Sequence, residues 1–330
     1  MAPRPIPALL VSSLLVVASA VAPLWAADPP PNFPNKEIRF VVPWNAGGSN
    51  DIAARALAQL AAEQGVRIIV ENVPGATGSI GMTKVANAEP DGYMIGMGTS
   101  STLALIAQNL TPLRNEQFAP IARVTIDPLV LLVPSNGPAT TLESFIAHLK
   151  KNPGKISIGT PGNNNLNHIF AVMTGRVAGV EVIAVPYTGG SKVVADLAGK
   201  QIDAAVLKPS ESKALIDGGL VKPIAVFANE RLKALPDVPT FKEKGFDVFP
   251  YGPLVQMAYI VVPNATPALV RERLIAIFSK AIQSSKFKTS AEESGAVVDD
   301  LTGAALNREI SSVQKSLNEV GKKVFVAEKK

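Results

Sequence analysis

Short apolar runs alternate with amphipathic segments along most of the chain. The run Ile38–Val42 predicts a buried strand. The next segment, Asp51–Glu63, predicts a helix, because its apolar positions fall on one side. The alternation continues through the middle of the chain, whereas the last third is mostly helical. Strands that alternate with helices predict an α/β fold with parallel sheets.

The same patterns give the remaining elements. We predict strands at 38–42, 66–70, 94–97, 129–133, 156–158, 182–185, 204–207 and 223–227. We predict helices at 51–63, 79–88, 103–109, 142–151, 166–177, 192–198, 267–284, 286–294 and 304–327.

Two apolar stretches with proline punctuation interrupt this order, and we predict that they cross between two lobes. They are Pro120–Pro128 and Phe249–Met257. Lobe 1 is then 27–127 plus 251–330, and lobe 2 is 128–250. A chain of about 300 residues after its leader suits two domains. Two crossings between the same lobes form a hinge.

The first 26 residues predict a cleaved secretory signal peptide. One cation, Arg4, precedes an apolar run from Ala8 to Val21 with serine interruptions. A membrane anchor is the alternative, but this run is shorter than the ~20 residues that span a bilayer. We expect the mature protein in the periplasm. Cleavage fits best after Ala26 or Ala27, with Ala20 and Ala22 as open alternatives.

Composition excludes several classes of function. The chain has no cysteine, which excludes disulfides, thiolate metal sites, a cysteine nucleophile and a lipid anchor on cysteine. Its formal charge of +5 is spread thinly and aromatic residues are only 5%, so nucleic acid is not an expected partner. A mildly positive body favours anionic solutes.

Four strand-to-helix junctions combine glycine with serine, threonine or asparagine. Glycine lets the backbone approach a ligand, and the first amides of a helix lack internal partners. Together with the helix dipole these amides form an anion site. Any single junction is explained as well by ordinary turn and cap chemistry. Because there are four in two lobes, we predict a carboxylate site at Pro43–Asn50, Gly96–Thr102, Gly159–Asn165 and Pro186–Ser191.

These residues carry a resemblance to a known family. The chain resembles the Bug family, the binding proteins of tripartite tricarboxylate transporters. The matching motifs are Ile38–Pro43 with Gly47–Arg55, Val70–Gly81, Pro90–Tyr93, Pro186–Gly189, Asp196–Asp203, and Leu235–Thr240 with Gly245.

The resemblance implies a Venus flytrap fold of type II and a role without catalysis. A ligand carboxylate would lie in the cleft between the lobes, held by backbone amides and ordered water. The receptor would work as a monomer without cofactor or metal, and would pass its solute to integral-membrane permease subunits. The residues carried over from the family are Ala46, Gly47, Gly48, Ser49, Gly162, Asn163, Asn164 and Tyr187.

The full set of expected ligand-binding residues follows the four junctions and their flanks. This chain departs from the family pattern at Trp44–Ala46, at its triple asparagine and at Lys208–Pro209. The set is Trp44, Asn45, Ala46, Gly47, Gly48, Ser49, Asp51, Thr77, Thr99, Ser100, Thr160, Gly162, Asn163, Asn164, His168, Tyr187, Thr188, Gly189 and Lys208.

Several of these residues have a structural alternative. Asp51 either binds a ligand amine or caps its helix and pairs with Arg55. His168 either faces the ligand or is a core or capping histidine. Trp44 is either ordinary packing or a cleft wall, which would suit an aromatic solute.

Lys208 ends a predicted strand with apolar neighbours. It either contacts a second anionic group of the ligand or forms a surface ion pair with Glu211 or Asp203. The ligand candidates therefore stay open among dicarboxylates, tricarboxylates, amino acids and aromatic carboxylates.

The alternative function is a two-lobed hydrolase or isomerase acting on a small carboxylate. No nucleophile elbow, phosphate loop or dinucleotide fingerprint occurs in the sequence. Asp51 and Asp91 are not paired as acid and base. The two histidines, His148 and His168, are too far apart to predict a metal centre.

Overall fold

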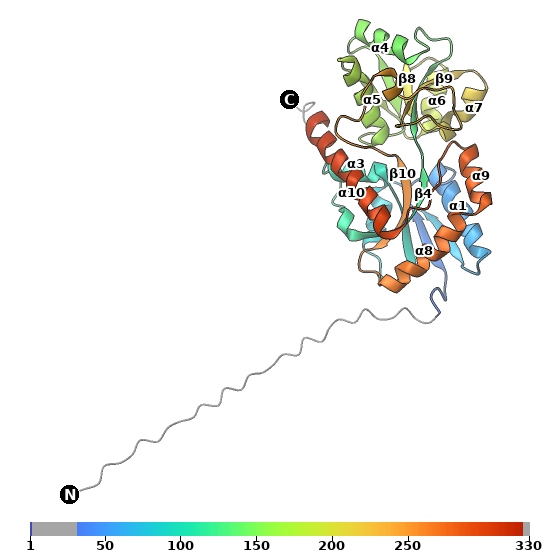
Figure 1. The fold of residues 1–330 in the computed structure, drawn as a ribbon, viewed down its shortest axis with the longest axis vertical. Helices are drawn as coiled ribbons and strands as arrows, with labels where there is room; N and C mark the ends of the chain where they lie inside the picture. The colour runs from blue at the N-terminus through green and yellow to red at the C-terminus, as the bar shows by residue number, and fades with distance from the viewer. Residues whose placement is uncertain (2–31, 326–330) are drawn as a thin grey trace.

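Two five-stranded sheets, each covered by helices, form the two lobes (Figure 1). The computed structural model describes residues 32–325 and Met1. The predicted signal peptide therefore lies almost entirely outside the described residues. Within the described part, no helix has the length and apolar character needed to cross a membrane.

The first sheet has the strand order β2-β1-β3-β10-β4. Its first three strands are parallel, and β10 runs antiparallel between β3 and β4. α1 and α8 pack on one face, whereas α2, α3 and α10 pack on the other. The strands are β1 Ile38–Val42, β2 Ile68–Asn72, β3 Met94–Thr99, β4 Phe118–Ile126 and β10 Met257–Pro263. The helices are α1 Ser49–Ala62, α2 Ser79–Ala86, α3 Ser100–Ala107, α8 Ala268–Ile282, α9 Ser285–Glu293 and α10 Gly303–Val320, with short turns η1 Ala76–Gly78, η2 Asn115–Gln117 and η4 Gly321–Phe325.

The second sheet has the strand order β7-β6-β8-β5-β9. α4 and α5 pack on one face, and α6 and α7 pack on the other. The strands are β5 Leu129–Pro134, β6 Ser157–Thr160, β7 Ile183–Pro186, β8 Ala204–Leu207 and β9 Val221–Phe227. The helices are α4 Leu142–Lys151, α5 Leu166–Ala178, α6 Gly190–Ala198 and α7 Pro209–Asp217, with the short turn η3 Lys242–Lys244.

Both sheets are mixed: β1, β2 and β3 are parallel, as are β6, β7 and β8, so the prediction of parallel sheets holds for these strands and not for β5, β9, β10 and β4. β10 is antiparallel to its neighbours in the first sheet, and β5 is antiparallel to β8 and β9 in the second. The cause is the crossing between lobes, because a strand that enters from the other lobe runs against the strands already there. The sequence also failed to predict β4, β10 and α7.

The chain crosses between the sheets twice. It leaves the first sheet after β4 through Asp127 and Pro128, and it returns through the segment before β10. The backbone N–H of Asp127 donates to the carbonyl oxygen of Gln256 at 2.8 Å, which joins the two crossings. The exact lobe boundaries at 127/128 and 250/251 stay a prediction.

The last helix also reaches from the first lobe to the second. In Figure 1, α10 rises along the side of the lower lobe toward the upper one. Arg176 of α5 donates to the carbonyl oxygen of Lys323 at 3.1 Å, and Val324 is buried. The turn η4, which follows α10, therefore adds a non-covalent contact between the lobes next to the two crossings.

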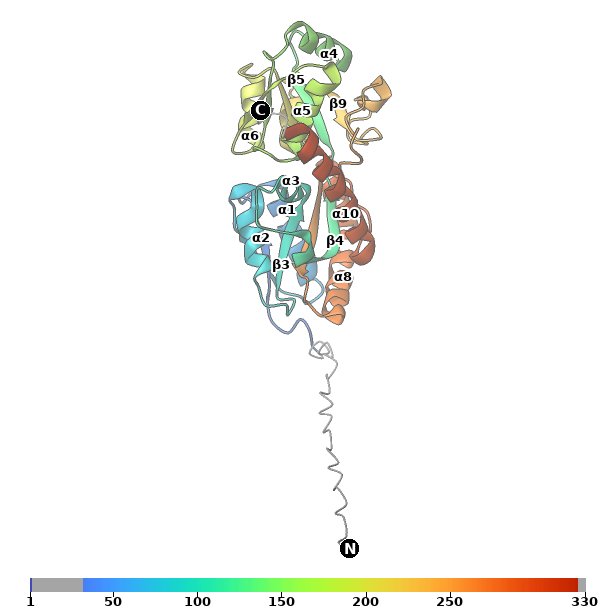
Figure 2. The same ribbon diagram turned by 90° about the vertical axis from the view of Figure 1, so that its left-hand side faces the viewer.

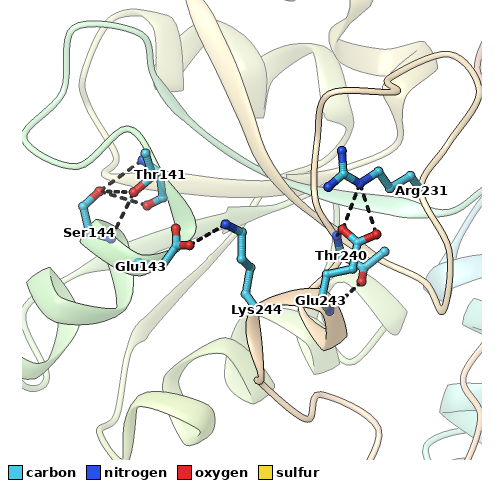
Figure 3. Close-up of polar contacts among 7 residues, drawn as sticks. All are labelled: Thr141, Glu143, Ser144, Arg231, Thr240, Glu243 and Lys244. Atoms are coloured by element: carbon cyan, nitrogen blue, oxygen red, sulfur yellow. Dashed lines mark hydrogen bonds and ion pairs between the residues drawn. The ribbon is translucent and has the colours of Figure 1, made fainter.

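A long segment after β9 is attached to the outside of the second lobe by exposed polar contacts (Figure 3). Lys244 pairs with Glu143 of α4 at 2.6 Å, and Arg231 pairs with Glu243 at 2.9 Å. Thr240 caps the turn that contains Glu243. Because exposed ion pairs contribute about 0–1 kcal/mol each, they position this segment more than they stabilise the lobe.

An aromatic stack forms part of the core of the second lobe, and a substitution in it tests how much this packing stabilises the fold. Phe170 is 1% exposed, stacks on Phe227 at 4.5 Å and meets Phe249 edge-on at 5.7 Å. We predict that Phe170→Ala lowers the free energy of unfolding by about 3–5 kcal/mol, measured by denaturant unfolding. The control, Leu269→Ala at a 46% exposed position, should change it by about 0.5 kcal/mol or less. Equal losses in both variants would contradict this packing.

Candidate functional site

Two of the four junctions contact the other lobe directly. The four junctions precede α1 and α3 in the first lobe and α5 and α6 in the second, and Figure 2 shows α1 and α3 in the lower lobe and α5 and α6 in the upper one. Two hydrogen bonds cross between the lobes. Lys208 Nζ donates to Ser49 Oγ at 3.0 Å, and Gln108 Nε2 donates to the carbonyl oxygen of Asn164 at 2.9 Å. The first and third junctions therefore lie at the contact between the lobes, whereas a ligand site shared by all four junctions stays a prediction.

The first junction is held open by a buried carboxylate. Asp51 is 2% exposed and accepts hydrogen bonds from Gly47 N at 2.8 Å, Asn72 Nδ2 at 2.9 Å and Arg55 Nε at 3.0 Å. Burial opposes ionisation of Asp51, but the bonds from Arg55, Gly47 and Asn72 outweigh it and hold its pKa below the usual value. Asp51 thus pairs with Arg55 and fixes the loop, which agrees with the structural alternative given for it in the sequence analysis.

Apart from the Gly47 amide, which bonds Asp51, the amide groups of this junction remain accessible. The backbone from Asn45 to Gly48 is exposed, and α1 begins after Gly48 without any side-chain cap. The first amides of α1 therefore lack a side-chain acceptor from the described residues. Trp44 is half-buried and packs on Gly78, where an added Cβ would lie 3.1 Å from the indole ring.

The second junction is mostly buried. Ser100 Oγ donates to the carbonyl oxygen of Val255 and accepts from Met257 N at 3.1 Å, so it attaches α3 to the second crossing. The hydroxyl groups of Thr99 and Thr102 are buried without a hydrogen-bond partner among the described residues. Nearby, Thr77 has a left-handed backbone with φ of 51°.

The third junction satisfies its own polar groups. Asn165 caps α5 by accepting from His168 N at 2.9 Å, and Thr160 Oγ1 donates to the carbonyl oxygen of Gly162 at 2.7 Å. Asn164 N donates to His168 Nδ1 and to Asn163 Oδ1, both at 3.0 Å. Because Asn165 takes the capping position, the start of α5 is less open to a ligand anion than the start of α1.

The fourth junction faces an acid of the protein itself. Tyr187 is half-buried, and its hydroxyl bonds to Asp196; burial first, and then this contact, raise the Tyr187 pKa. Thr188 is exposed, and Gly189 gives α6 no side-chain cap. The carboxyl group of Glu211 lies beside Gly190, where an added Cβ would be 2.7 Å from its Cδ. A ligand anion at this helix would therefore approach a carboxylate.

Lys208 lies at the centre of the site and is already engaged. It is 7% exposed, and its Nζ lies 3.4 Å from Asp127 Oδ2 as well as bonding Ser49. Asp127 is 6% exposed and also accepts from Thr125 Oγ1 at 2.8 Å. Neither partner expected from the sequence pairs with the ammonium group. Glu211 accepts only the Lys208 backbone N–H, at 3.2 Å, and Asp203 binds Ser157.

A cavity of about 100 Å³ lies beside this ion pair. It separates α1 and α9 of the first lobe from the start of α7, and Ser49, Asp127 and Ser210 contribute polar atoms to it. The described residues contain no group of acids and histidines suited to a metal ion. Among the described residues, this region therefore offers hydrogen-bond donors, the ammonium group of Lys208, which is already paired, and the carboxylate of Glu211, which forms no salt bridge.

Three residues at this contact were not among the expected site residues, although Glu211 was named as a possible ion-pair partner of Lys208. Asp127, Gln108 and Glu211 act through contacts with residues distant in the chain, except for the local Glu211 bond to Lys208 N. A usable signal existed for Glu211, because it stands three residues after the helix cap at Lys208, as in a capping box.

We predict that Lys208→Met strongly destabilises the protein, because it leaves Asp127 buried without a counter-ion. The expected loss in the free energy of unfolding is about 3–5 kcal/mol. Adding Asp127→Asn should recover part of that loss. The control, Lys213→Met on α7, removes an exposed pair with Asp217 and should cost about 1 kcal/mol or less. A small loss for Lys208→Met would show that the pair is not effectively buried.

We predict that His168 makes stability depend on pH. Burial lowers its pKa from 6.5, and its Nδ1 must stay unprotonated to accept from Asn164 N. A lowered folded-state pKa gives stability that is present above the unfolded pKa and lost as pH falls through the folded value. His168→Asn keeps an acceptor without titrating, so its unfolding free energy should fall less between pH 7.5 and pH 5. The same fall in both proteins would exclude His168 as a cause.

Comparison with known proteins agrees with this geometry. The family model for the tripartite tricarboxylate transporter family receptor matches residues 52–320. The chain is 33% identical over 265 residues to a UPF0065 protein of Bordetella pertussis, covering 79% of this chain and 81% of that protein. The structure of the periplasmic binding protein BugD gives a TM-score of 0.78 at 29% identity, over 88% of this chain and 98% of that chain. MatC from Rhodopseudomonas palustris with bound malate gives 0.74 at 26% identity, with the same coverage.

These relatives confirm two predictions from the sequence. The fold is the two-lobed α/β fold of periplasmic binding proteins. The prediction that the chain is not an enzyme is also confirmed, because the family and its structural neighbours are solute receptors. The chain belongs to the tripartite tricarboxylate transporter receptor family, the Bug family whose motifs its sequence carries.

Proposed function

We propose that this receptor binds a small carboxylate between its lobes in the periplasm and delivers it to the permease subunits of a tripartite tricarboxylate transporter. The observation that carries the proposal is the exposed, uncapped start of α1 at Gly48, facing the other lobe beside Lys208. The ligand candidates are a dicarboxylate, a tricarboxylate, an amino acid or an aromatic carboxylate.

Backbone amides are sufficient to hold such a ligand. A hydrogen bond to a charged group contributes about 1.5–3 kcal/mol, and micromolar binding needs about 8 kcal/mol. Several amides at the start of one helix, together with the helix dipole, reach that range without a free cation. Bound malate in the related MatC supports a carboxylate as the class of ligand.

The two lobes supply the closing motion. A ligand that contacts both lobes stabilises the closed form, and only this difference in contacts shifts the equilibrium. The bonds from Lys208 to Ser49 and from Gln108 to Asn164 form only when the lobes approach. The closed receptor is the form that we propose docks on the permease, as a monomer.

Location in the periplasm rests on the leader and on the family. The apolar segment within residues 1–26 has the character of a secretory signal. Receptors of this family act outside the cytoplasmic membrane, where a permease accepts their solute.

We predict that Gly48→Leu weakens carboxylate binding about tenfold or more, because a side chain there blocks approach to the first amides of α1. The fold tolerates the change, since φ at Gly48 is −78° and an added Cβ meets only Asn45 O at 3.5 Å. Isothermal titration against a panel of carboxylates measures the effect.

A matched control exists in the second lobe. Gly199 also has a φ of −78° and an added Cβ there has ordinary contacts, but it lies at the far end of α6. Gly199→Leu should bind like the wild type. Unchanged affinity in Gly48→Leu would move the carboxylate away from α1, and no binding of any carboxylate by the wild type would reject the proposed function.

A further inference from the structure

Glu211 is an acid beside the start of α6 that forms no salt bridge with the residues that the structure describes, although the charge of Lys208 acts on it. Its side chain is half-buried in the first turn of α7, next to the start of α6. It forms no ion pair with any described residue, and its Oε1 receives no hydrogen bond from them. Protein atoms surround the carboxyl group, and this burial raises its pKa although Lys208 opposes the effect.

The local structure does not need this negative charge. Glu211 Oε2 accepts the backbone N–H of Lys208 at 3.2 Å, which is the acid's half of a capping box. Glutamine serves that half equally well. The starts of α6 and α7 offset part of the charge through their dipoles. Burying a carboxylate costs desolvation, and a perturbed acid whose full charge the cap does not need is more frequent at functional sites.

The neighbouring cations are already engaged. Lys208 Nζ pairs with Asp127 at 3.4 Å, and Lys192 pairs with Asp196 at 2.6 Å. Arg55, beside the first junction, is bound to Asp51. Asp127 also acts on Glu211 by repulsion. A second carboxylate on the ligand would therefore enter a region where the described side chains offer one unpaired acid and no free cation.

Lys208 links Glu211 to the start of α1. The backbone N–H of Lys208 bonds Glu211, and the ammonium group of the same residue bonds Ser49, the first residue of α1. One lysine residue thus contacts both the start of α1 and the acid.

We infer that Glu211 is a specificity residue, which selects ligands that carry a protonated amine in addition to a carboxylate and disfavours dicarboxylates and tricarboxylates without one. This inference rests on the proposed function, because it assumes that the cleft binds a carboxylate. The ammonium group supplies the counter-ion and the donor that Oε1 lacks. Amino acids are the class of ligand that fits.

Paired probes test the inference by isothermal titration. Each pair differs by one amine: alanine and propionate, aspartate and succinate, glutamate and glutarate, phenylalanine and 3-phenylpropionate. We expect the wild type to bind the amine member of at least one pair about tenfold or more tightly than its partner. Glu211→Gln keeps the cap, and should abolish that preference while binding the amine-free member at least as well.

Glu143→Gln is the matched control, because it removes the same charge from the remote, exposed pair with Lys244 (Figure 3). It should keep the wild-type preference. Equal or tighter binding of the amine-free members by the wild type, or an unchanged preference in Glu211→Gln, would overturn the inference and leave carboxylate binding intact. Failure of every carboxylate to bind would reject the proposed function, and the inference with it.

Discussion

The buried ion pair between Lys208 and Asp127 is the interaction around which the site is organised. Lys208 follows β8 of the second lobe, Asp127 stands in the first crossing, and Ser49 begins α1 of the first lobe. Burying two charges costs several kcal/mol per ion, and only good geometry offsets that cost. The pair therefore ties the end of one sheet, the hinge and the first junction into one arrangement.

Local patterns predicted much of the fold. The bounds expected for α4 and β8 match the structure, and the four junctions each precede a helix as expected. β4 and β10 were missed because they pair with each other across more than a hundred residues, and their prolines resemble linkers. α7 was missed because its first turn, Lys208-Pro209, looks like the end of a strand rather than a cap followed by proline.

The sequence predicted the four helix starts, but it did not predict which of them is open to a ligand anion. From glycine and polar residues alone, the four helix starts looked equivalent as anion sites. The structure distinguishes them through side chains placed by tertiary contacts or by later helices. Asn165 caps α5, Ser100 ties α3 to the second crossing, and Glu211 faces α6, which leaves α1 as the open one. No spacing rule contains this information, because each helix start is closed by a different partner.

In the proposed site, two kinds of contact recognise the ligand: backbone amides and side chains. Backbone amides at α1 are presented by the loop geometry and by the Asp51 network, so they suit any carboxylate and discriminate little. In the proposed site, side chains at the start of α7 meet the rest of the ligand, and their charges decide which ligands bind. With this arrangement, the α1 amides bind any carboxylate, and selectivity between ligands depends on a few side chains. Among the described residues of this chain, the decisive difference is that Lys208 has its own acid, whereas Glu211 has no cation.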